Sequence, residues 1–181
     1  MSRIGNTLIN IPAGVTVEVK DNVLTVKGPK GTLTQAYDPV ITPVVEDNVI
    51  KFTRANDEGP TKAKHGLYRA LCANMVKGVT EGFTKKLIVN GVGWKVNKQG
   101  NKIVLNVGFS HPVEIVEIDG ITLDCPAQTE ITVSGISKEK VGQFSAMIRG
   151  IREPEPYHGY GIRYDDEVIE RKVGKAAGGK G

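Results

Sequence analysis

Residues 62–79, KAKHGLYRALCANMVKGV, and residues 138–151, KEKVGQFSAMIRGI, are two versions of one pattern. At an offset of 76 residues both read Lys-x-Lys-x-Gly-x-aromatic-x-Ala, and at an offset of 72 their ends align as MVKGV and MIRGI. The difference between the offsets is about one turn of α-helix, so an insertion of that length keeps the same face buried. The two segments therefore predict a duplicated fold.

Both segments have the spacing of a helix with one buried face. Their apolar residues recur at steps of three or four, as Leu67, Leu71, Met75 and Val79 in the first segment and as Val141, Phe144, Ile148 and Ile151 in the second. Pro60 and Thr61 favour the start of the first helix, and Ser137 is the predicted N-cap of the second.

Alternating apolar residues ahead of each helix predict antiparallel strands. In the first half, residues 15–28 turn at Asp21-Asn22, GPKG leads into a strand at 32–37, and residues 44–53 turn at Asp47-Asn48. The second half repeats this plan, with strand patterns in residues 93–107, 112–118, 121–125 and 129–135.

The predicted fold class is therefore α+β, with two tandem homologous domains, each a small, mainly antiparallel sheet covered by one helix. We expect domains at 1–83 and 84–152, followed by an irregular, basic C-terminal extension at 153–181.

Composition excludes few functions, but the position of the charges is informative. The formal net charge is +4, and no apolar run approaches the about 18 residues of a membrane span. The two cysteines lie far apart, which favours a reduced, cytoplasmic protein. The last eleven residues contain Arg171, Lys172, Lys175 and Lys180 and no acid. This pattern indicates either a tail that binds phosphates or one that only aids solubility.

The residues able to carry catalysis do not form a recognisable site. His65 and His111 are interpreted as solvated or capping side chains, Cys72 as a small buried hydrophobe, and Cys125 as the end of a strand before Pro126. None has the spacing of a metal site, so we expect no metal and no cofactor. A small hydrolase using either cysteine is the enzyme alternative.

Neither the glycine motifs nor the acidic run indicates a nucleotide or metal site. GVGWKV at 91–96 lies between predicted strands and does not open a helix, and KGPKGTL at 27–33 favours a tight turn over a phosphate loop. Asp165-Asp166-Glu167 is interpreted as a solvated or helix-starting stretch. We therefore expect a protein that is not an enzyme and has no small-molecule substrate.

Residues 152–175, REPEPYHGYGIRYDDEVIERKVGK, combine tyrosines, glycines and cations. Aromatic rings stack on bases and guanidinium groups pair with phosphates, so the mixture is typical of RNA-binding surfaces. The alternative is an arm that packs Tyr157 and Ile162 against its own domain.

The sequence resembles the bacterial form of the sixth large-subunit ribosomal protein family along essentially its whole length. The resemblance rests on MSRIGNTLINIPAGVTV, VKGPKGTL, HGLYRALCANMVKGVTEGF, GVGWKV and the stretch at 152–175. It implies a structural constituent of the large ribosomal subunit, in the cytoplasm, that binds large-subunit ribosomal RNA near the sarcin–ricin loop and the factor-binding region. The implied partners are that RNA, neighbouring proteins near the stalk base and translation factors, with no membrane. An RNA-binding regulator outside the ribosome is the alternative.

The predicted RNA-binding residues lie on the second helix, at its exit and in the extension. They are Lys138, Lys140, Arg149, Arg152, Tyr157, Gly159, Tyr160, Gly161, Arg163, Tyr164, Arg171, Lys172 and Lys175. The family pattern here usually reads Pro-Glu-Pro-Tyr-Lys-Gly-Lys-Gly-Ile, so His158 and Tyr160 replace two lysines. Stacking by Tyr160, and protonation of His158 beside phosphates, are two hypotheses for what replaces those charges.

Overall fold

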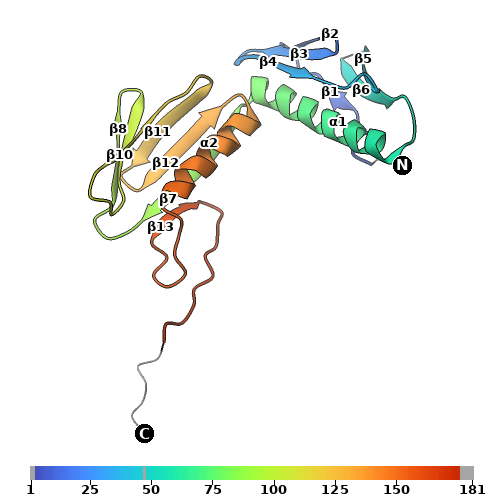
Figure 1. Cartoon of the computed structure of the whole chain (residues 1–181). Coiled ribbons are helices and arrows are strands. Elements are labelled where there is room, and N and C mark those ends of the chain that lie inside the picture. The colour runs from blue at the N-terminus through green and yellow to red at the C-terminus, as the bar shows by residue number, and fades with distance from the viewer. Residues whose placement is uncertain (1–2, 47, 176–181) are drawn as a thin grey trace. The chain divides into compact units, whose positions relative to one another are not determined.

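The computed structural model describes residues 3–46 and 48–175. Contacts divide the chain into two compact units, Met1–Phe83 with Ile136–Lys138, and Thr84–Gly135 with Glu139–Gly181. Each unit combines antiparallel strands with one main helix (Figure 1), which confirms the predicted α+β class. Asp47, predicted to share a turn with Asn48, lies outside the described residues, as does Lys180. Within the described chain, no helix is long and apolar enough to cross a membrane.

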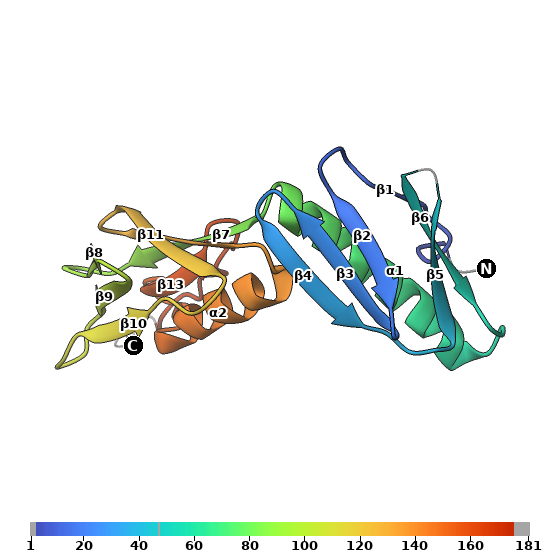
Figure 2. The same cartoon turned by 90° about the horizontal axis from the view of Figure 1, so that it is seen from above.

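The first unit contains two three-stranded sheets and helix α1 (Figure 2). The sheet orders are β2-β3-β4 and β1-β6-β5. The strands are β1 (Ile9–Asn10), β2 (Thr16–Lys20), β3 (Val23–Gly28), β4 (Gly31–Ala36), β5 (Ile41–Glu46) and β6 (Val49–Arg54), and the helix is α1 (Gly59–Thr80). Each predicted hairpin is present, and Asp21 and Asn22 adopt φ of 50° and 57°, as a two-residue turn between twisted strands requires.

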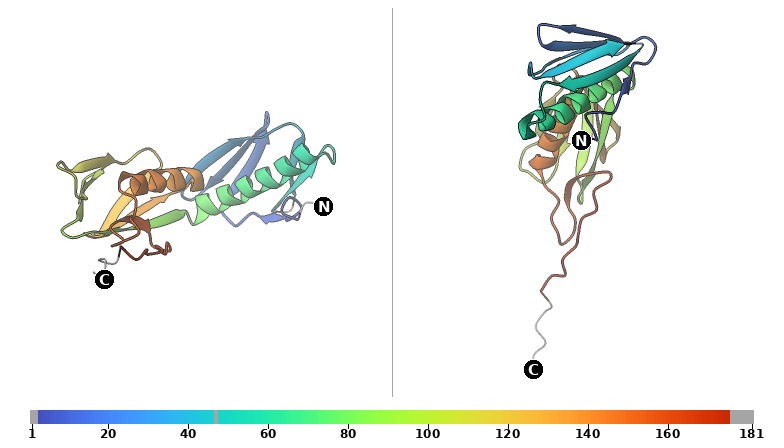
Figure 3. Two further views of the ribbon diagram at one scale, coloured as in Figure 1. Left: turned by 60° about the horizontal axis from the view of Figure 1, so that its bottom comes forward. Right: turned by 90° about the vertical axis from the view of Figure 1, so that its right-hand side faces the viewer.

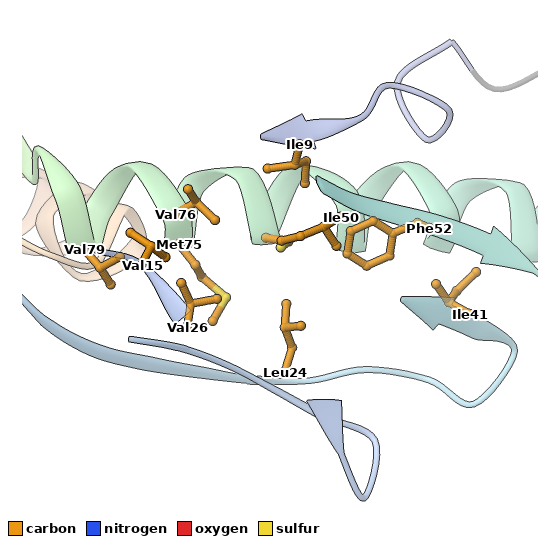
Figure 4. Close-up of a cluster of buried hydrophobic side chains, with 11 residues drawn as sticks. Ile9, Val15, Leu24, Val26, Ile41, Ile50, Phe52, Met75, Val76 and Val79 are labelled. Carbon is orange, nitrogen blue, oxygen red and sulfur yellow. The ribbon is translucent and has the colours of Figure 1, made fainter. Parts of the chain in front are cut away.

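The core of the first unit lies between α1 and the strands (Figure 4). Its buried members are Ile9, Val15, Leu24, Val26, Ile41, Ile50, Phe52, Cys72, Met75, Val76 and Val79. Each large apolar side chain removed from water here contributes about 1.5–3 kcal/mol. Cys72 is fully buried, as predicted, and burial raises the pKa of its thiol to about 12.

The prediction for His65 is wrong, because this side chain is only 2% exposed. Its Nε2 donates to the carbonyl oxygen of Phe52 at 2.9 Å, and its Nδ1 accepts from the Arg54 guanidinium at 3.1 Å. Both ring nitrogens are therefore satisfied by the neutral form of the ring. Helical spacing placed His65 among charged neighbours, but it could not indicate that β6 supplies partners for a buried imidazole.

The second unit contains helix α2 and two sheets with the orders β11-β12-β7-β13 and β10-β9-β8. The strands are β7 (Phe83–Asn90), β8 (Lys95–Gln99), β9 (Lys102–Asn106), β10 (Val113–Val116), β11 (Ile121–Ala127), β12 (Glu130–Gly135) and β13 (Gly161–Tyr164), and the helix is α2 (Lys138–Ile151). Figure 3 shows α2 lying along the four-stranded sheet. Cys125 does not end its strand, because β11 continues through Pro126 to Ala127 with a register shift.

Strand β13 lies inside the segment expected to be irregular. It pairs antiparallel with β7, so that Ile162 lies opposite Val89 and Tyr164 opposite Leu87. Ile162 is fully buried. One buried apolar side chain in a four-residue strand gives too short an alternation to be recognised in the sequence. The start of the C-terminal segment is therefore part of the sheet of the second unit.

Candidate nucleic-acid interface

The C-terminal arm, residues 152–175, begins with a turn organised by one carboxylate. Glu155 accepts hydrogen bonds from the backbone N–H groups of Tyr157 at 2.8 Å, His158 at 2.6 Å and Tyr160 at 3.1 Å. Burial acts to raise the pKa of Glu155, but these three donors hold it below its ordinary value. The turn thereby fixes the backbone from which His158 and Tyr160 project.

Two glycines hold the arm against the sheet. Gly161 has φ of 151°, and a Cβ at this position would lie 2.3 Å from the Cα of Pro154. Gly159 has φ of 75°, and its carbonyl accepts from the side-chain amide of Asn90 at 3.0 Å. Both positions therefore require glycine for the fold itself, independently of any RNA.

Arg149 on α2 forms a two-pronged ion pair with Glu167 of the arm. Its Nε lies 2.9 Å from Glu167 Oε2, and its Nη2 lies 2.5 Å from Oε1. The hydrogen bonds from Arg149 are the main cause of a pKa of Glu167 below its ordinary value. The interpretation of Glu167 as solvated or helix-starting is wrong, because its carboxylate is paired and only 23% exposed.

Arg163 is also engaged within the chain. Its Nη1 donates to the carbonyl oxygens of Tyr164 at 3.0 Å, Asp165 at 3.2 Å and Glu167 at 3.1 Å. A guanidinium group that donates hydrogen bonds to several backbone carbonyls in this way holds a loop in one conformation. Tyr164 lies close by, with Lys85 Nζ 5.2 Å from its ring centroid.

The two lysines at the start of α2 lie apart from the arm in the sequence and have partners of their own. Lys138 donates to Asn74 Oδ1 at 3.4 Å and belongs to the first unit, whereas Lys140 donates to the carbonyl of Asp119 at 3.2 Å in the second. Both residues are exposed. Lys138, the first residue of α2, is therefore grouped with the first unit, whereas the rest of α2 belongs to the second.

The end of the arm is exposed and cationic. Arg171, Lys172 and Lys175 are exposed, and none of their side chains forms a hydrogen bond or ion pair within residues 3–46 and 48–175. A backbone hydrogen bond from Lys172 N to the carbonyl of Pro156, at 2.8 Å, attaches this end to the turn. Tyr157, at 54% exposure, also points to solvent and not into the domain.

Arg152 and Tyr160 meet aromatic residues that sequence reasoning did not assign to a site. The Arg152 guanidinium lies 5.8 Å from the ring centroid of Trp94 and 5.3 Å from that of Phe109. The Tyr160 ring lies 6.4 Å from that of Trp94. The signal for Trp94 was present in GVGWKV, where Gly91 leaves room for the indole, but the neighbours of Trp94 come from segments distant in sequence.

The described residues contain no arrangement typical of catalysis. No group of three His, Cys, Asp or Glu side chains in this part of the chain is placed to hold a metal. Burial raises the pKa of both Cys72 and Cys125, which disfavours the thiolate. The surface is thus one of cations, rings and backbone turns.

Comparisons with known proteins identify the family of the chain. A family model described as "Ribosomal protein L6" matches residues 11–82 and 90–165. The chain is 55% identical to the large ribosomal subunit protein uL6 of Exiguobacterium sibiricum, over 97% of this chain and 98% of that protein. It is 56% identical to the protein of the same name from Caldicellulosiruptor bescii, over 99% of this chain and 100% of that protein. The chain therefore belongs to the ribosomal protein L6 family.

Proposed function

We propose that this chain is a structural component of the large ribosomal subunit, and that it binds large-subunit ribosomal RNA through the C-terminal arm and the loops beside it. The names of its relatives support the ribosomal role. As a member of this family it is a structural protein and not an enzyme.

The observation that carries the RNA-binding proposal is the contrast along the arm. Residues 152–167 are held by the sheet, by α2 and by the Glu155 turn, whereas Arg171, Lys172 and Lys175 follow them in the chain without side-chain hydrogen bonds or ion pairs in the described residues. A fixed base carrying unpaired cations is suited to phosphates, because few groups must be ordered when the complex forms.

The proposed location is near the sarcin–ricin loop and the factor-binding region, beside proteins of the stalk base, in the cytoplasm. The family resemblance of the sequence supports this location. RNA binding by a regulator outside the ribosome is the competing function, and it predicts a chain that binds free RNA but is absent from large-subunit particles.

Sedimentation of tagged protein through a sucrose gradient in high salt tests the proposal. Four chains are compared: the parent, a truncation ending at Glu170, Arg171→Glu with Lys172→Glu, and the charge-preserving Arg171→Lys with Lys172→Arg. Ending at Glu170 keeps β13 and the Arg149–Glu167 pair, so loss of binding would not report loss of the fold.

The proposal expects the parent and the charge-preserving chain to travel with the large subunit. The truncation and the chain with glutamate at both positions should be depleted from the large subunit. A parent chain that stays at the top of the gradient contradicts the ribosomal role. Equal incorporation of all four contradicts only the role of the exposed cations.

A further inference from the structure

Six planar side chains of the second unit form a continuous row. Ring-centroid distances are 5.4 Å from His158 to Tyr160 and 6.4 Å from Tyr160 to Trp94. The guanidinium of Arg152 lies between the rings of Trp94 and Phe109, and His111 stacks on Phe109 at 6.3 Å. We call these residues the aromatic row: His158, Tyr160, Trp94, Arg152, Phe109 and His111.

The row is assembled from three separate segments, and the backbone of each is fixed near the rings. The loop after β7 carries Trp94, and a Cβ on Gly91 would lie 2.2 Å from the indole. The loop after β9 carries Phe109, and Gly108 has φ of 79° beside the same indole. The Glu155 turn supplies the third segment through its three backbone hydrogen bonds.

A shallow pocket opens beside the row, lined by Trp94, Arg152, Glu153, Glu155 and Tyr160, with a volume of about 330 Å³. That volume is at the small end of the about 300–1,000 Å³ range of ligand sites. The carboxylates of Glu153 and Glu155 at the edge of the pocket would repel a phosphate, whereas the rings of Trp94 and Tyr160 favour a flat, uncharged group. Arg152, exposed beside the pocket, is the cation placed to meet the phosphate attached to such a group.

We propose that the aromatic row is a stacking site for unpaired bases of RNA, with the pocket that Trp94 and Tyr160 help to line taking one base and Arg152 pairing with the adjoining phosphate. The inference rests on the proposed function and specifies its ligand as single-stranded or looped RNA. A continuous duplex keeps its bases stacked on one another and offers no free face to the rings. Phe109, at 41% exposure, and Tyr160, at 37%, are open to such contact.

Trp94 is the only tryptophan of the chain, so its fluorescence reports directly on the pocket. We would titrate the full chain with a ten-nucleotide oligoadenylate and, separately, with a blunt RNA duplex of the same length. The expected result is saturable quenching by the oligoadenylate and little quenching by the duplex. Stacking on aromatic residues is worth enough that Tyr160→Ala should weaken oligoadenylate binding roughly 5- to 150-fold.

Three further variants keep the test interpretable. Tyr160→Phe retains the ring and should restore binding, which separates stacking from a general loss of structure. Phe109→Ala should weaken binding by a smaller factor, because Phe109 does not line the pocket. Leu67→Ala removes an exposed apolar side chain of α1, outside the row and outside the predicted RNA-binding residues, and should leave affinity unchanged.

Equal quenching by the duplex, or no quenching by the oligoadenylate, overturns the inference. If quenching is absent but Tyr160→Ala is lost from large-subunit particles, the row contacts a neighbouring protein instead, which also overturns it. Failure of the proposed function would be recognised by a different result. The parent chain would then be missing from the large subunit in the sedimentation experiment, whatever the fluorescence showed.

Discussion

The cations of the second unit fall into two groups that the sequence makes look alike. Arg149 and Arg163 bind within the chain, one to the Glu167 carboxylate and the other to three backbone carbonyls. Arg171, Lys172 and Lys175 have no such side-chain partners in the described residues. The difference teaches that the arm has two parts. The inner part is held in place by Arg149 and Arg163, and the outer part carries cations that are available to bind RNA.

The largest expected effect comes from detaching the inner arm. Gly161→Ala would place a methyl group against the backbone of Pro154 in a strained conformation, which should lower the free energy of unfolding by about 2–4 kcal/mol. Urea denaturation checks this. Gly142→Ala on α2 is the control, because its methyl group meets open space and should stabilise the helix by about 0.5–1 kcal/mol. Equal stability of the two variants would show that the arm is not anchored at Gly161.

The second expected effect separates the two groups of cations directly. Arg149→Met removes the ion pair with Glu167, and charged hydrogen bonds of this kind are worth about 1.5–3 kcal/mol of stability. The slope of log affinity for RNA against log salt should not change, because Arg149 is already paired. A fall in the slope without a fall in stability would place Arg149 among the RNA-binding cations.

The third effect is a pH dependence of the same ion pair. The pKa of Glu167 is held below its ordinary value of 4.5, so its unfolded form takes up protons first as the pH falls. Its stabilising contribution is therefore complete above pH 4.5 and is lost as the pH falls through the lower, folded-state pKa. The stability difference between the parent and Glu167→Gln should be largest at neutral pH and shrink in acid. A difference that stays constant would contradict this.

The smallest effect on stability is expected for the outer cations. Arg171→Gln with Lys172→Gln should change the free energy of unfolding by less than about 0.5 kcal/mol, because both side chains are exposed. The same double change should reduce the salt slope of RNA binding by about 1.4–1.8 if both cations pair with phosphates. Filter binding over a salt series measures the slope, and an unaltered slope would show that this part of the arm does not touch RNA.

Much of the fold was predictable, because the elements have strong local signals. The helices follow from three- and four-residue spacing, and the hairpin at Asp21-Asn22 follows from alternation around a turn that accepts positive φ. Strand β13 and the burial of His65 were not predictable, since each depends on a partner distant in sequence: β7 for the strand, and Phe52 with Arg54 for the imidazole.

The candidate site was predictable only in composition. The sequence identified Arg152 and Tyr160, but it gave no reason to join them to Trp94 and Phe109, which come from other loops. It also could not distinguish Arg149 from Arg171, because pairing with Glu167 depends on where the folded arm lies against α2. Residue type indicates which chemistry is present, whereas the fold decides which groups are free to use it.

Tethered hydroxyl-radical cleavage from the outer arm tests the central claim most directly. The chain would carry Cys125→Ser and Lys172→Cys with an iron–EDTA probe. Cys72 should stay unmodified, because it is fully buried and its thiol pKa is raised to about 12. In assembled large subunits, the account predicts breaks in the large-subunit RNA at a few discrete positions near residue 172. Subunits that contain the tethered protein but show no breaks above those of the probe-free chain would contradict it.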